Sequence, residues 1–147
     1  MERDTAWELA DDLRSLASLI ELNHEDLPES FHCDPYSMIW KWTPDVKEAG
    51  GVPTVLAGAM RAGLKFDGCD IKKEYTDSRF RLQLKMPNER ITYEITAQRD
   101  EVCTKHVTGT HMVEKDVPPD GEWTKKMVEE DIVEWDCHPL LSIVKDN

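Results

Sequence analysis

The chain has 147 residues, a length that suits a single domain, 1–147, built around one hydrophobic core. Its 30 acidic and 18 basic residues give a formal charge of −12, which disfavours direct binding to nucleic acid or membrane and favours a protein partner with a basic surface. No apolar run approaches the roughly 18 residues that span a membrane, and no signal-peptide core follows Met1, so we expect a cytoplasmic protein.

The first predicted element is a helix over 6–22. The segment Thr5-Ala6-Trp7-Glu8 has the form of a capping box, which marks a helix start. An apolar stripe follows at helical spacing: Ala6, Leu9, Ala10, Leu13, Leu16, Ala17 and Ile20. Asp11 and Asp12 fall on the other, polar side of this helix.

A strand with one bulky face is predicted over 36–42. Tyr36, Met38, Trp40 and Trp42 share that face, and Ser37, Ile39 and Lys41 share the other. Because aromatic side chains mostly line cores, we expect the bulky face to be buried, with a ligand platform as the alternative. A helix start follows at Pro44, Gly50-Gly51 interrupts it, and a second helix runs from Pro53 to Gly63.

The clearest pattern is an antiparallel hairpin. Apolar and polar residues alternate over 79–86 and again over 90–98, with a turn between them at 87–89. An earlier strand near 69–75 extends the hairpin to a meander, and further extended segments lie near 104–117 and 127–137. The pattern predicts an α+β fold: two helices packed on one face of a mostly antiparallel, meander-rich sheet of about six strands.

Basic side chains gather on the polar face of this hairpin: Arg79, Arg81, Lys85 and Arg90, joined by Lys72 and Lys73. Such a face can bind an anion or a phosphate backbone. We expect a solvated, charge-paired face instead, because Glu74, Glu94 and Glu114 can act as cross-strand partners. Proteins that bind single-stranded nucleic acid interleave aromatic residues with the charge, and this face has none.

Four cysteines are spread along the chain without a C-x-x-C pair: Cys33, Cys69, Cys103 and Cys137. In a reducing cytosol we expect four buried thiols, no bound metal and no cofactor. An alternative places a zinc site or a thiol nucleophile at Cys103, His106 and Cys137. Cys137 and His138 project to opposite faces of a strand, so they do not form a thiol and its base.

The last predicted strand is crowded with carboxylates: Glu129, Glu130, Asp131, Glu134 and Asp136. Charged strands often protect the edge of a sheet against unwanted pairing. We expect Glu130, Glu134 and Asp136 to project together, opposite Val133 and Trp135, and to form a partner-binding row that docks on a basic protein surface.

Three segments resemble a group of small, uncharacterised proteins of actinobacteria and their phages: SRFRLQL, ITYEITAQRDEVCTKHVTGTHMVE and IVEWDCHPLL. That group shares an N-terminal helix, a meander, a V-C-x-x-x-V-x-G-T-like segment and a closing E-W-x-C-x-P-L-L. The resemblance spans most of the chain. It implies a phage or actinobacterial origin and transfers no catalytic residue.

We therefore expect a non-enzymatic cytoplasmic binding or regulatory protein, encoded by a phage, that engages a host protein through an acidic sheet edge. Two alternatives stay open. One is a mimic of DNA charge that inhibits a DNA-binding protein, and the other is a small metal-dependent or thiol enzyme built on Cys103, His106 and Cys137. The identity of the partner and the oligomeric state are not encoded in any motif of the chain.

Overall fold

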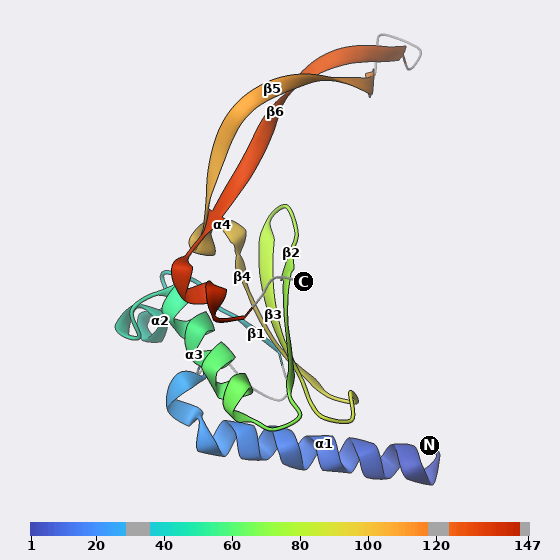
Figure 1. The fold of residues 1–147 in the computed structure, drawn as a ribbon, viewed down its shortest axis with the longest axis vertical. Coiled ribbons are helices and arrows are strands. Elements are labelled where there is room, and N and C mark those ends of the chain that lie inside the picture. Colours follow the sequence, from blue (N-terminus) through green and yellow to red (C-terminus); the bar gives the residue numbers. More distant parts are fainter. Residues whose placement is uncertain (29–35, 118–123, 145–147) are drawn as a thin grey trace. The chain divides into compact units, whose positions relative to one another are not determined.

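The computed structural model describes residues 1–28, 36–117 and 124–144, and it confirms the α+β fold (Figure 1). The helices are α1 (Arg3–Leu22), α2 (Pro44–Glu48), α3 (Val52–Lys65) and α4 (Arg99–Val102), with 3-10 turns η1 (His24–Asp26) and η2 (Pro139–Ile143). The strands are β1 (Tyr36–Met38), β2 (Asp70–Tyr75), β3 (Arg79–Lys85), β4 (Thr92–Gln98), β5 (Cys103–Val117) and β6 (Thr124–Cys137). Contacts divide the chain into two units, Met1–Val102 with Cys137–Asn147, and Cys103–Asp136.

The first unit holds a four-stranded sheet with the order β1-β4-β3-β2. Strands β2, β3 and β4 form the predicted antiparallel meander, while β1 pairs in parallel with β4. The other two strands, β5 and β6, make a separate two-stranded sheet, so the expected sheet of about six strands is divided. The reason is that β1 occupies the place beside β4 that a continued meander would give to β5.

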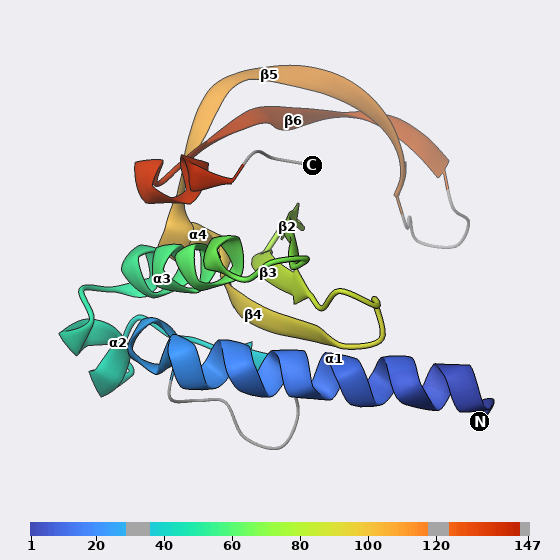
Figure 2. The same ribbon diagram turned by 60° about the horizontal axis from the view of Figure 1, so that its bottom comes forward.

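The core lies between this sheet and α3. Side chains that alternate along β3 and β4 are fully buried: Phe80, Leu82, Leu84, Tyr93, Ile95 and Ala97. Figure 2 shows α3 along that face of the sheet, and Leu56 and Met60 of α3 are likewise buried. The facing predicted for the hairpin is therefore confirmed.

The bulky side of β1 is not part of the core, contrary to expectation. Ser37 and Ile39 are each 1% exposed, whereas Tyr36 is 44% and Trp42 58% exposed. The pairing with β4 explains the reversal, because Tyr36 lies beside Glu94 and so shares the polar face of the sheet. Regular pairing ends at Met38, after which Trp40 and Trp42 stack at 4.7 Å between ring centroids.

Helix α1 is rotated relative to the expected apolar stripe. Its buried residues are Asp12, Leu16 and Leu19, and Leu13 is 50% exposed. The cause is Asp12, whose carboxylate accepts backbone hydrogen bonds from Asn88 (2.8 Å), Arg90 (2.7 Å) and Ile91 (3.2 Å) in the β3–β4 turn. Figure 2 shows α1 passing beneath this turn. A residue expected in solvent thus anchors the helix to the sheet.

No helix in the described ranges is both long enough and apolar enough to cross a membrane.

Candidate interaction surfaces

Strands β5 and β6 form a sheet that has almost no core of its own. Of the side chains described in this sheet, only that of Cys103 is buried. Apolar side chains instead stand exposed along both strands: Val107 (57%), Met112 (56%), Met127 (59%) and Ile132 (41%). The sheet contains two strands, so each has one edge without a strand partner. We refer to β5 and β6 together as the ribbon.

Cross-strand contacts hold the two strands of the ribbon together. The Nε2 atom of His106 lies 3.0 Å from an Asp136 carboxylate oxygen, and the Thr110 hydroxyl donates to Glu129 at 2.7 Å. Lys115 forms an ion pair with Glu130. The first two pairs run in opposite directions along the strands, from His106 with Asp136 to Thr110 with Glu129, as antiparallel pairing requires.

The three residues predicted to bind a partner do not all project alike. Exposure alternates from Val133 to Cys137, with Glu134 and Asp136 in the exposed set. Asp131 and Ile132 are both exposed, so the alternation changes phase there, as at an irregularity in strand pairing. The Glu130 side chain is only 32% exposed, compared with 83% for Asp136. The structure thus brings Glu134 and Asp136 together and separates Glu130 from them.

The expectation of four thiols is wrong, because Cys103 and Cys137 are disulfide-bonded. Cys69 is free, and Cys33 lies outside the described residues. One further cysteine cannot serve both bonded residues, so the bond joins Cys103, at the start of β5, to Cys137, at the end of β6. A bonded sulfur is neither a nucleophile nor a zinc-binding thiolate. This weighs against the enzyme built on Cys103, His106 and Cys137.

His138 and Cys69 are likewise engaged or inert. His138 caps η2, because its Nδ1 atom accepts a hydrogen bond from the backbone N–H of Leu140 at 3.2 Å. Burial, reinforced by the charge of Asp70, raises the pKa of the Cys69 thiol to about 11, so the thiol stays protonated at neutral pH. Among the residues that the structure describes, no group of three His, Cys, Asp or Glu side chains gathers as a metal site.

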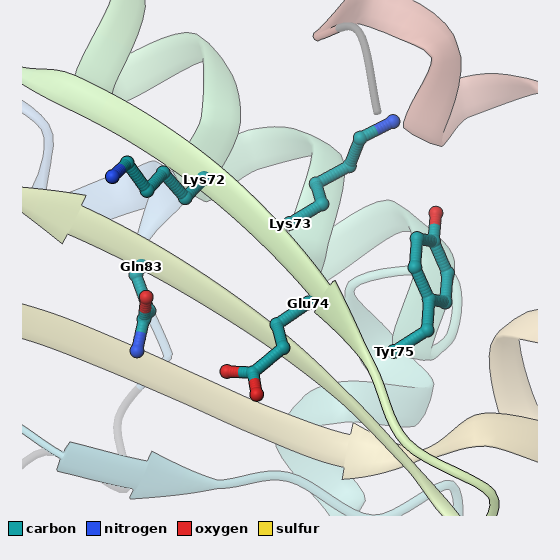
Figure 3. Close-up of a pocket in the computed structure, with 5 residues that line it drawn as sticks. All are labelled: Lys72, Lys73, Glu74, Tyr75 and Gln83. Atoms are coloured by element: carbon teal, nitrogen blue, oxygen red, sulfur yellow. The ribbon is translucent and has the colours of Figure 1, made fainter. Parts of the chain in front are cut away.

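The basic face of the meander is largely neutralised. Arg81 lies 3.7 Å from Glu74, as predicted for a cross-strand pair, and Lys85 lies 4.0 Å from Glu89. Lys73 is not on this face at all, since it is 5% exposed and its Nζ donates to the carbonyl of Leu141 at 2.8 Å. Figure 3 shows Lys73 and Tyr75 rising from β2 on the side away from Glu74. These ion pairs match the solvated, charge-paired face that we expected, and Arg90 is likewise paired with Glu8 of α1 at 2.7 Å.

Two hollows mark the surface of the first unit. The one in Figure 3, about 470 Å³, is lined by Lys72, Lys73, Glu74, Tyr75 and Gln83 at the β2 edge of the sheet. The other, about 550 Å³, lies among η1, α2 and α3 and is bordered by several carboxylates. One of these, Asp26, lies 3.6 Å from Arg61 and 3.8 Å from Lys65. In the second hollow the Thr54 hydroxyl donates to the carbonyl of Gly50 at 3.3 Å, and Nδ1 of His24 lies 3.2 Å from the carbonyl oxygen of Glu21.

No family model, no curated protein and no solved structure matches this chain. The membership suggested by the resemblance to actinobacterial and phage proteins therefore stays a prediction.

Proposed function

We propose that this protein is a non-enzymatic binding protein whose contact element is the ribbon, and that its partner is a protein with a basic surface. The single observation that carries the proposal is the exposure of the ribbon, in which Cys103 alone among the described side chains is buried. An isolated two-stranded sheet is marginally stable in water, so a sheet of 15- and 14-residue strands is well suited to being covered by a partner.

Charge supports the choice of partner. The described strands of the ribbon carry seven acidic residues and four lysines, and five of the acidic residues lie between Glu129 and Asp136. Exposed apolar side chains such as Val107 and Ile132 stand among these carboxylates. Most protein interfaces combine apolar contacts with complementary charge, whereas mimicry of DNA relies on the carboxylates. The mixture therefore favours a partner surface that is partly apolar as well as basic over a surface that normally binds DNA.

The phage origin and the cytoplasmic location belong to the proposal as well. If the chain is encoded by a phage, the partner is a host protein. In the cytosol, glutathione and thioredoxin keep most thiols reduced, so a cytoplasmic protein would hold Cys103 and Cys137 as thiols for much of its life. Fractionation of the native host tests the cytoplasmic location, and trapping of free thiols in the same fractions tests the redox state of Cys103 and Cys137.

The decisive experiment compares two triple variants of equal charge. The first variant removes three charges from the ribbon by Glu130→Gln, Glu134→Gln and Asp136→Asn. The second, the control variant, removes three exposed charges from the first unit by Asp67→Asn, Asp77→Asn and Asp100→Asn. Proteins captured from the host by the wild-type chain are identified, purified and tested by surface plasmon resonance at low and high salt.

We expect the ribbon variant to lower the association rate by about tenfold at low salt, with less effect at high salt, because screening weakens steering beyond a Debye length of about 8 Å. The control variant should associate at nearly the wild-type rate. Equal rates for the two variants, in folded protein, would move the binding surface away from the ribbon.

A further inference from the structure

Helix α1 leaves an apolar stripe in solvent. Ala6, Ala10, Leu13, Ala17 and Ile20 follow one another at intervals of four, three, four and three residues, and we call this stripe the outer seam. Leu13 is 50% exposed, Ala6 and Ala17 are exposed, and Ala10 and Ile20 are half-buried. Asp12 and its hydrogen bonds turn the helix so that a different stripe faces the sheet.

The spacing of the outer seam is that of a helix-pairing surface. Alternating intervals of three and four residues keep a seam on one side of a helix and match it to an equivalent seam on another helix. The helix is 20 residues long, which corresponds to about 30 Å of axis. It is therefore long enough to form several layers of contact with a second helix.

We propose that the outer seam is a dimer interface at which α1 packs antiparallel against α1 of a second copy of this chain. The sizes of the side chains favour this occupant. When two copies align in opposite directions over most of their length, Ala10 of each lies opposite Leu13 of the other, and Ala6 lies opposite Ala17. Each leucine thus meets an alanine, which permits the interaxial distance of about 8 Å at the lower end of the usual range.

Charges beside the seam select the same arrangement. Trp7, Arg14 and Glu21 lie along one flank of the outer seam, and Arg3 continues the seam itself toward the N-terminus. In the antiparallel pair Arg3 approaches Glu21 of the second copy, and Arg14 approaches the face of its Trp7. Trp7 is 66% exposed and already lies 5.8 Å from the Arg3 guanidinium within one chain, so its ring is presented to cations.

The parallel arrangement is disfavoured by the same residues. Parallel helices would pair every seam residue with its own copy, so Leu13 would meet Leu13 instead of an alanine. Arg3, which continues the seam spacing toward the N-terminus, would face a second Arg3. One helix pair buries an area at the low end of specific interfaces, so the expected dissociation constant is micromolar, about 1 to 100 µM.

Sedimentation equilibrium of the full chain tests the dimer, with Leu13→Glu as the seam variant and Leu22→Glu as the matched control. Both residues are exposed leucines of α1, but Leu22, 78% exposed, lies outside the seam. Wild-type protein and the control should dimerise alike, whereas Leu13→Glu should raise the dissociation constant by at least about tenfold, equivalent to about 1.4 kcal/mol. Circular dichroism confirms that each variant is folded.

A charge exchange tests the direction of the helices. Glu21→Arg should weaken the dimer by placing two arginines together, and the added change Arg3→Glu should restore it. A wild-type chain that stays monomeric throughout the micromolar range would overturn the proposal, as would a Leu13→Glu variant that dimerises as well as wild type. If the double variant is no tighter than Glu21→Arg alone, the antiparallel arrangement is wrong.

Discussion

Asp12 shows how a single carboxylate can set the orientation of an entire helix. It is fully buried, and its two oxygens accept hydrogen bonds from three backbone N–H groups of the β3–β4 turn. A buried donor without a partner costs about 1 to 3 kcal/mol, and hydrogen bonds to charged groups contribute more than neutral ones. The packing of α1 against the β3–β4 turn therefore depends on the Asp12 carboxylate.

We predict that Asp12→Asn lowers the free energy of unfolding by about 2 to 4 kcal/mol, because the amide NH₂ group would face at least one backbone donor. Asp11→Asn is the matched control: its carboxylate accepts one surface bond from the Asn88 amide at 3.0 Å, and its loss should cost less than about 1 kcal/mol. Urea titration measures both. Similar losses for the two variants would show that Asp12 does not anchor α1.

Asp12 could not be identified from the sequence. Its hydrogen-bond partners lie 76 to 79 residues further along the chain, and an aspartate on the polar side of an amphipathic helix is ordinarily solvated. Helical periodicity predicted that α1 exists, and the structure extends it from Arg3 to Leu22. The face that α1 buries is a tertiary property, decided by a turn that the helix does not contain.

At the scale of elements, close contact between α3 and η1 depends on Gly58. A Cβ atom added there would lie 2.8 Å from the backbone oxygen of Asp26. At Gly63 an added Cβ would lie 2.9 Å from the ends of the Ile71 and Leu84 side chains. Backbone atoms yield less readily than the tips of side chains, so the two glycines should respond differently to the same change.

We predict that Gly58→Ala destabilises the fold by about 1 to 3 kcal/mol, although alanine gains about 1 kcal/mol of helix propensity over glycine. Gly63→Ala should cost less, because Ile71 and Leu84 can change rotamer. Thermal unfolding of both variants measures the difference. If Gly58→Ala proves more stable than wild type, η1 does not pack tightly on α3.

Local periodicity predicted the elements better than it predicted their neighbours. The meander was predictable because alternation over β3 and β4 carries both the strands and their buried face. Strand β1 was not, because Tyr36 is large and apolar yet lies on the polar side of the sheet once β1 pairs in parallel with β4, and Trp42, beyond the end of the strand, is exposed. Similarly, the acidic character of β6 could be read from the sequence. The break at Asp131 and Ile132 in the alternation of exposed and half-buried side chains, which separates Glu130 from Glu134 and Asp136, could not.

At the scale of the whole molecule, the two units differ in what stabilises them. The first has an extensive core that includes Leu19, Leu56 and Phe80, each fully buried. The ribbon has no comparable core in its described part, and the disulfide between Cys103 and Cys137 closes it at one end. Closing a loop of about 35 residues stabilises a fold by about 4 kcal/mol in the chain-entropy description.

We therefore predict that reducing the disulfide loosens the ribbon and leaves the first unit folded. In hydrogen–deuterium exchange, the amides of β5 and β6 should exchange at least about tenfold faster after reduction, or in the double variant Cys103→Ser, Cys137→Ser, because a two-stranded sheet is only marginally stable without further support. The amides of β3 and β4 should keep their protection, since the β2-β3-β4 ladder and fully buried side chains such as Phe80 and Leu82 hold them.

Cys69→Ser is the control for the loss of a sulfur atom, because Cys69 is free and lies outside the ribbon; it should change neither pattern. Two results would contradict this division of stability. If β3 and β4 lose protection together with the ribbon, the chain unfolds as one cooperative body. If the ribbon keeps its protection without the disulfide, cross-strand contacts such as His106 with Asp136 are sufficient to hold it, and the redox state would then have no influence on the surface offered to a partner.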